Sequence, residues 1–222
     1  MVPKIVAVAA TKGGVGKTTI AVQLAIGRAR QGHDVWLVDG DRQQTAQTAL
    51  MLRGQDERKP GIACAAYADG AQLRAQVLLQ KDKWDCIIID VGGVDSTTLR
   101  AALSVCDVLV LPFQPRSYDV WALSQMSKIL SEVTQCRDKF PVYAFLNCAD
   151  VAQSTENAEA AKTLEEYPEM IYLDTPVRRR KAVAIASGFG MGVSEMKKKD
   201  PKAEVEINRL LKAVFSDMPK ES

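Results

Sequence analysis

The chain alternates short apolar runs with longer segments whose apolar residues recur at helical spacing. The apolar runs have the length and composition of strands buried on both faces of a sheet. They lie at 4–10, 34–41, 62–67, 85–93, 107–113, 141–147 and 170–176. The helical segments lie at 18–32, 71–81, 97–105, 118–133 and 155–167, and helical sequence follows the last strand. This order predicts an α/β fold, a doubly wound and mostly parallel sheet flanked by helices.

Length and composition are typical of one soluble domain, so we expect residues 1–222 to form a single domain. The 222 residues are 47% hydrophobic and 25% charged. Trp36, Trp84 and Trp121 are expected to pack in the core. Five widely spaced cysteines without a C-x-x-C pair indicate reduced thiols in the cytoplasm. The sequence shows no leader before the first strand and no run long enough to cross a bilayer, which also favours a cytoplasmic protein.

Residues 9–19 read AATKGGVGKTT and join the first expected strand to the first helix. A glycine-rich loop in this place can direct its backbone N–H groups at phosphate oxygens. Lys17 would reach the outer phosphates, and the Thr18 hydroxyl would hold Mg²⁺. The usual loop reads G-x-x-x-x-G-K-[ST], but position 11 is a threonine, and a second lysine, Lys12, follows it. The expected phosphate-binding residues are Gly13, Gly14, Val15, Gly16, Lys17, Thr18 and Thr19.

Three carboxylates stand at the ends of two expected strands. Asp90 closes the run CIIID, in which a buried strand delivers an acidic side chain to a metal beside the phosphates. Asp39 and Asp41 stand at the end of the strand expected at 34–41, with one residue between them. Because side chains alternate along a strand, both point to the same side. One of the two could orient an attacking water, while Asp39 could instead cap the next helix.

The motifs KGGVGKTT, VDGDRQQ and CIIIDVGG resemble those of the deviant-Walker ATPases of the ParA/MinD type. The resemblance covers nearly the whole chain, and LPFQPRSYDVWAL together with the series from Arg180 to Glu195 resembles the ParA branch. It implies a P-loop NTPase that hydrolyses ATP slowly, with ATP and Mg²⁺ as cofactors. In that family the lysine matching Lys12 crosses the interface of an ATP-sandwich homodimer. A cation supplied in this way neutralises the triphosphate only when two subunits close. The alternative for Lys12 is a solvated lysine at the surface, beside the loop.

The resemblance also implies the roles of other residues. Lys12, Lys17 and Asp41 would be catalytic, and Asp41 would position the hydrolytic water beside the metal. Asp90 would hold Mg²⁺ through a water. Asn147 would read the adenine, and Pro176 in the DTPVR turn would line the base. The sequence departs from the family at two expected switch segments, where Arg42 and the run 91–93 (VGG) stand in place of prolines.

Positive charge is concentrated near the end of the chain. Ten basic and four acidic residues between 176 and 212 give a local charge of +6, whereas the whole chain carries +2. The resemblance implies that the ATP-bound dimer binds double-stranded DNA without reading its sequence. The alternative is an ordinary solvated face. The candidate DNA contacts are Arg178, Arg179, Arg180, Lys181, Lys197, Lys198 and Lys199.

The expected function is that of a ParA-like switch that positions a plasmid, a chromosome region or another cargo. A ParB-like adaptor would stimulate hydrolysis, and the protein would associate with the nucleoid. No helix-turn-helix precedes the first strand and no basic amphipathic tail follows the last helix, so neither autorepression nor membrane binding is expected. Two alternatives stay open: a MinD-like regulator at the membrane, and a metallocluster carrier that would hold iron through thiols.

Overall fold

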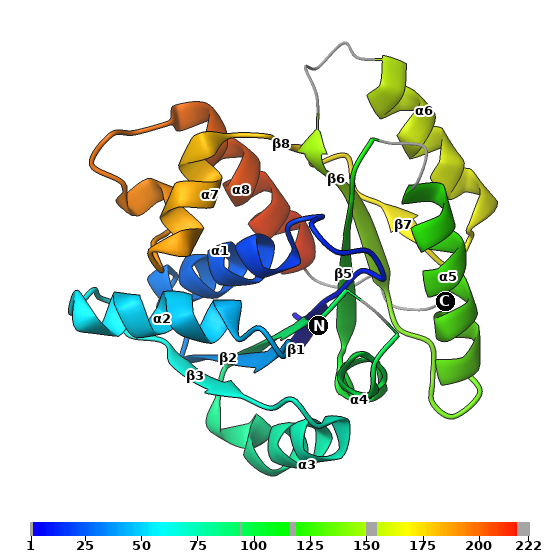
Figure 1. Cartoon of the computed structure of the whole chain (residues 1–222), viewed down its shortest axis with the longest axis horizontal. Coiled ribbons are helices and arrows are strands. Elements are labelled where there is room, and N and C mark those ends of the chain that lie inside the picture. Colours follow the sequence, from blue (N-terminus) through cyan, green and yellow to red (C-terminus); the bar gives the residue numbers. More distant parts are fainter. Residues whose placement is uncertain (1, 94, 116–118, 150–154, 217–222) are drawn as a thin grey trace.

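The computed structural model describes residues 2–93, 95–115, 119–149 and 155–216 and confirms the α/β fold (Figure 1). Its strands all pair in parallel, in the order β3-β2-β4-β1-β5-β6-β7, with β8 beside β6. The strands are β1 (Ile5–Val8), β2 (Val35–Gly40), β3 (Ala63–Ala66), β4 (Cys86–Val91), β5 (Val108–Phe113), β6 (Val142–Ala149), β7 (Ile171–Tyr172) and β8 (Val177–Arg178). The α-helices are α1 (Lys17–Arg30), α2 (Thr45–Gln55), α3 (Gly70–Gln80), α4 (Thr97–Val105), α5 (Asp119–Val133), α6 (Thr155–Thr163), α7 (Lys181–Gly188) and α8 (Pro201–Val214). Short 3-10 helices are η1 (Lys81–Lys83), η2 (Leu164–Glu166) and η3 (Val193–Glu195).

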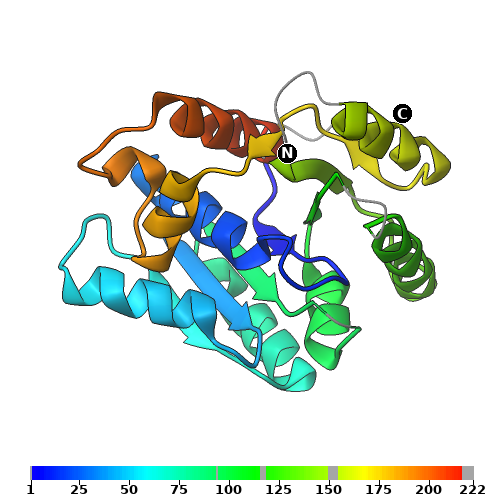
Figure 2. The same ribbon diagram turned by 45° about the horizontal axis from the view of Figure 1, so that its top comes forward.

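Strand β1 lies at the centre of the sheet and is buried on both faces. Ile5 and Ala7 belong to the core shared with α3, α4 and α5, whereas Val6 and Val8 belong to the core shared with α1, α2, α7 and α8. Successive side chains of a strand point to opposite faces, which is why this strand is apolar at every position. Helices α7 and α8 accordingly lie on the same side of the sheet as α1 and α2 (Figures 1 and 2).

The structure differs from the sequence prediction in three places. Helix α2 occupies a segment in which the apolar pattern predicts no element; its inward positions include two alanines and Arg53, so the apolar signal is weak. The strand expected at 170–176 is replaced by the two short strands β7 and β8. The prediction that Trp121 packs in the core is wrong, because its side chain on α5 is 73% exposed. Trp36, in contrast, is buried and stacks on Trp84.

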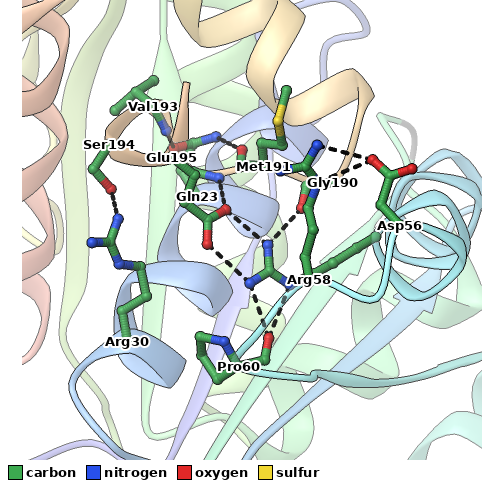
Figure 3. A network of polar contacts seen from close by, with 12 residues as sticks. Gln23, Arg30, Asp56, Arg58, Pro60, Gly190, Met191, Val193, Ser194 and Glu195 are labelled. Atoms are coloured by element: carbon green, nitrogen blue, oxygen red, sulfur yellow. Dashed lines mark hydrogen bonds and ion pairs between the residues drawn. The ribbon is translucent and has the colours of Figure 1, made fainter. Parts of the chain in front are cut away.

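A buried arginine, Arg53, joins α2 to the segment between α7 and α8. Figure 3 labels its partners Pro60, Gly190 and Glu195. Arg53 is 1% exposed, and its guanidinium donates to both carboxylate oxygens of Glu195, at 2.8 and 3.0 Å. It also donates to the carbonyl oxygens of Pro60 and Gly190, each at 2.9 Å. Burial acts to raise the pKa of Glu195, but the bonds from Arg53 and the Gly192 N–H outweigh it and the pKa is lowered. The buried charge is therefore paired and hydrogen-bonded.

Gln23 of α1 also binds this segment (Figure 3). Its amide nitrogen donates to the Ser187 hydroxyl at 2.9 Å and to the Met191 carbonyl oxygen at 2.8 Å. Its amide oxygen accepts from the backbone N–H of Val193 at 3.0 Å. Segment 187–195 is thus bonded both to α1 and to α2.

Two carboxylates in this part of the fold allow a matched test of burial. Glu195→Gln removes one charge from a pair whose side chains are 2% and 13% exposed, and we expect it to lower the free energy of unfolding by about 3 kcal/mol, because Arg53 stays buried. Asp56→Asn removes one charge from the exposed pair with Arg58, and we expect a decrease below about 1 kcal/mol. Urea unfolding measures the free energy of unfolding of each variant. Equal decreases would contradict the conclusion that the Arg53–Glu195 pair is buried and the Asp56–Arg58 pair is exposed.

Candidate functional site

The glycine-rich loop leaves the end of β1 and runs into α1, the arrangement that the sequence predicts. Gly14 and Gly16 have φ values of 76° and 87°, in the left-handed region that favours glycine. Gly16 is constrained a second time, because a Cβ there would lie 2.4 Å from the amide nitrogen of Asn147. The backbone N–H groups that follow belong to the first turn of α1, where the helix dipole favours an anion.

Three side chains hold the backbone of the loop in place. The Thr11 hydroxyl donates to the carbonyl oxygen of Ala122 in α5 at 3.0 Å. The Gln114 amide, just after β5, donates to the Gly14 carbonyl oxygen at 3.0 Å. The Asn147 amide, in β6, donates to the Val15 carbonyl oxygen at 2.7 Å. The sequence prediction missed these supports; the polar side chains that end the apolar runs of β5 and β6 are the signal that could have indicated two of them.

The two lysines of the loop differ in their surroundings. Lys17 is 7% exposed, and its ammonium group donates to the Lys12 carbonyl oxygen at 3.1 Å. Burial lowers the pKa of Lys17, while the charges of Asp90 and Asp41 act in the opposite direction. Lys12 is partly exposed, and it is followed by the exposed Gly13. Lys17 is therefore held within the loop, and Lys12 lies nearer the surface.

Asp90 presents a buried carboxylate at the end of β4. Asp90 is 1% exposed, and neither of its carboxylate oxygens makes a hydrogen bond within the described part of the chain. Burial raises the pKa of Asp90 to about 8, against the influence of the Thr18 hydroxyl and the Lys17 charge. A buried carboxylate whose oxygens make no hydrogen bond with a described residue, together with the nearby Thr18 hydroxyl at the start of α1, is a donor set that suits Mg²⁺. The residues present therefore fit the metal that the sequence predicts.

Asp39 lies beside Asp90 but has a different role in the fold. The two residues are paired in register across β2 and β4. The Asp39 carboxylate accepts from the backbone N–H groups of Asp41, at 3.0 Å, and Gln47, at 2.9 Å, and so holds the turn into α2. Burial raises its pKa, and these hydrogen bonds act against the rise. Of the two possibilities that the sequence left open for Asp39, the geometry favours the structural one.

A cavity of about 1000 Å³ opens in front of the loop. It is lined by residues of the loop, the β2–α2 turn, the segment after β4 and the first turn of α4. Asp41 lies in its wall, half-buried, with one carboxylate oxygen accepting from the Gln43 N–H at 3.0 Å. Neither Asn147 nor Pro176 is among the described residues that line it, so their roles at the base stay predictions.

The first cluster of candidate DNA contacts, residues 178–181, contains two arginines that bond to a buried carboxylate. Glu206 of α8, 6% exposed, accepts from the guanidinium of Arg178 at 2.6 Å and from that of Arg180 at 2.8 and 3.0 Å. Burial acts to raise the pKa of Glu206, but the two arginines outweigh it and the pKa is lowered. Two members of the cluster are thus engaged within the fold. The candidates that remain more exposed than these two are Arg179, Lys181, Lys197, Lys198 and Lys199.

In the described ranges, no helix has the length and apolar character needed to cross a membrane, and no three His, Cys, Asp or Glu side chains gather into a metal site. All five cysteines lie in these ranges, and no disulfide joins any two of them.

Comparison with known proteins agrees with the geometry of the loop. Residues 6–193 match the CobQ/CobB/MinD/ParA nucleotide binding domain. A maintenance of carboxysome distribution protein A from Gloeobacter kilaueensis is 30% identical, over 98% of this chain and 97% of its own length. The protein of the same name from Halothiobacillus neapolitanus is 27% identical, over 94% and 95%, and a ParA protein of Rhizobium radiobacter is 25% identical, over 88% and 87%.

Solved structures show the same fold at lower identity. McdA of Cyanothece superposes with a TM-score of 0.75, at 19% identity, over 96% of this chain and 99% of that one. A chain of the MinC–MinD cell division complex from Aquifex aeolicus gives a TM-score of 0.70, at 15% identity, over 99% and 98%. On its sequence match and its phosphate loop, this chain belongs to the ParA/MinD family of nucleotide-binding ATPases.

Proposed function

We propose that this protein is an ATP-driven switch that positions a cellular cargo. MgATP closes a homodimer with the nucleotides between the subunits, and the dimer binds double-stranded DNA without reading its sequence. A partner protein of the ParB-like adaptor type stimulates hydrolysis, and the subunits then separate and leave the DNA. Residues 1–222 act as one ATPase domain in the cytoplasm, at the nucleoid.

One observation carries this proposal: the loop holds two lysines with different surroundings. Lys17 is buried against the loop backbone and supplies a cation to the nucleotide of its own subunit. Lys12 lies nearer the surface, beside the exposed Gly13, where a second subunit can approach. A cation that arrives from the partner stabilises the negative charge of the transferring phosphoryl group only while the dimer is closed. Dimer closure and hydrolysis are thereby coupled.

The remaining roles follow from position. Mg²⁺ would neutralise charge on the outer phosphates. The Thr18 hydroxyl and, through a water, the Asp90 carboxylate would hold it. Asp41, in the cavity wall, would orient the water that attacks the phosphate. The loop N–H groups from 13 to 19 would bind the phosphate oxygens, and Asn147 and Pro176 would lie toward the base.

The cargo is inferred from the relatives. Two of them are named for the distribution of carboxysomes, another is a ParA protein, and a shorter match is a chromosome-partitioning ATPase. Solved relatives are described as complexes with ATP, or with ADP and magnesium. We therefore infer a plasmid, a chromosome region or a protein organelle as the cargo of this chain.

Lys12→Ala tests the switch. We expect the variant to bind MgADP within about threefold of wild type, a difference below about 0.7 kcal/mol, because Lys17 is untouched. We expect it to lose MgATP-dependent dimerisation and about 10³-fold in ATPase rate, because the cation in trans is gone. Lys17→Ala, in contrast, should lose nucleotide binding itself. Sedimentation measures dimerisation, and calorimetry measures nucleotide binding. If Lys12→Ala dimerised in MgATP at the same protein concentration as wild type, the role of Lys12 in trans would be refuted.

Asp90→Asn tests the buried carboxylate. The pKa of Asp90 in the folded protein, about 8, lies above its ordinary value of 3.8, so the folded state binds the proton more tightly and its stability falls as pH rises through this range. In EDTA, we expect the stability of Asp90→Asn relative to wild type to increase from about pH 4 to about pH 8. Its Mg²⁺-dependent ATPase should be abolished. Asp95→Asn, at an exposed carboxylate, should show no such increase. If the stability of Asp90→Asn relative to wild type also did not change with pH, the raised pKa of Asp90 would be refuted.

The DNA surface is tested by two variants of equal charge change. Arg179→Ala with Lys181→Ala removes two exposed cations at α7, and Lys81→Ala with Lys83→Ala removes two from η1, beside α3 on the opposite face of the sheet. We expect only the first to weaken DNA binding in MgATP, by at least about tenfold, and to reduce the salt slope by about one for each phosphate that is no longer neutralised. If both variants weakened DNA binding equally, net charge and not a particular surface would be responsible. If neither weakened it, the candidate DNA contacts would be the lysines at 197–199.

A further inference from the structure

The segment that follows Asp90 touches the backbone of the phosphate loop. Gly93 lies so close to it that an added Cβ would be 2.8 Å from the Gly13 nitrogen and 3.0 Å from the Lys12 carbonyl carbon. Distances of this size to backbone atoms cannot be relieved by rotating a side chain, so one of the two segments would have to move. Gly93 is therefore in contact with the peptide that joins Lys12 to Gly13.

That peptide is supported from two other directions. Its carbonyl oxygen accepts from the Lys17 ammonium at 3.1 Å. The residue before it, Thr11, is tied to the Ala122 carbonyl oxygen of α5 at 3.0 Å. The place from which the Lys12 side chain departs is therefore set by Lys17, by α5 and by Gly93 together.

The same segment also reaches the carboxylates of the site. It begins at Asp90, which fits Mg²⁺, and at Gly92 an added Cβ would lie 3.4 Å from a carboxylate oxygen of Asp41. Three residues of chain thus connect the metal-binding end of β4 with the backbone of Lys12.

We propose that Gly93 is a positioning residue for Lys12, and that the segment 91–93 supports in its own subunit the lysine that acts on the partner's nucleotide. This rests on the proposed function, in which Lys12 acts in trans. Because the segment begins at Asp90, which would hold Mg²⁺ through a water, a displacement of the segment would be passed directly to the Lys12 peptide. A Cβ at 93 displaces that peptide, including the Gly13 N–H, and misplaces the lysine. The other N–H groups of the loop, from 14 to 19, stay in place, so most of the phosphate-binding donors are kept.

Gly93→Ala and Gly92→Ala form the test pair, because each adds one methyl group to the same segment. Neither glycine has a left-handed φ, and at Gly92 the nearest atom is at ordinary contact distance. With a nonhydrolysable ATP analogue and Mg²⁺, we expect the dimer of Gly93→Ala to be at least about tenfold weaker and that of Gly92→Ala to be within about threefold of wild type. Both variants should bind MgADP within about threefold of wild type, and both should melt within a few degrees of it.

Each outcome decides the matter. Wild-type dimerisation by Gly93→Ala overturns the proposal. If Gly93→Ala lost both MgADP binding and dimerisation, the proposal would also be overturned, because the whole phosphate loop would then be disrupted. Equal weakening by both variants would overturn it as well, since chain stiffness, and not the contact at Gly13, would then be responsible. A wild-type protein that fails to dimerise would instead count against the proposed function, which keeps the two failures apart.

Discussion

The arrangement of the site depends on the pairing of β1 with β4 and β5. Because β1 is central and buried on both faces, the loop that leaves it has a fixed origin. The register of β4 with β1 and with β2 then brings Asp90 and Asp39 to the same edge of the sheet. A slip of one residue in either strand would turn these carboxylates to the opposite face. Position in the sheet, more than any contact between side chains, therefore assembles the site.

The buried charges of this protein fall into two groups with opposite pKa directions. Glu195 and Glu206 are each bonded to arginine, and their pKa values are lowered. Asp90 is at least as deeply buried, but its oxygens make no hydrogen bond with any described residue, and burial raises its pKa to about 8. Paired carboxylates contribute to holding helices together, whereas an unpaired one costs stability until a cation arrives. Asp39, whose pKa burial also raises, differs from Asp90 in that its carboxylate accepts from two backbone N–H groups and holds the turn into α2.

The bonds from Gln23 and Arg53 give the nucleotide site a physical link to the basic surface. Helix α1 carries the phosphate loop, and α2 follows the turn that holds Asp41. Both are bonded to segment 187–195, which leads to the lysines 197–199. A change in the relative position of α1 and α2 must therefore move or strain this segment. The link is made of discrete bonds and can be broken one at a time.

The sequence by itself determined the order of most strands and helices, the phosphate loop and the acid at the end of β4. These are local signals: apolar runs, glycines and a lysine at fixed spacing are legible because each depends on a few neighbouring residues. Tertiary structure alone decided which side chains support the loop, as for Gln114 and Asn147, which lie 100 and 132 residues beyond their partners in the chain. It also decided that Glu206 engages Arg178 and Arg180. Such choices rest on contacts between distant segments, and the packing of α8 against β8 leaves no trace in the local pattern of either.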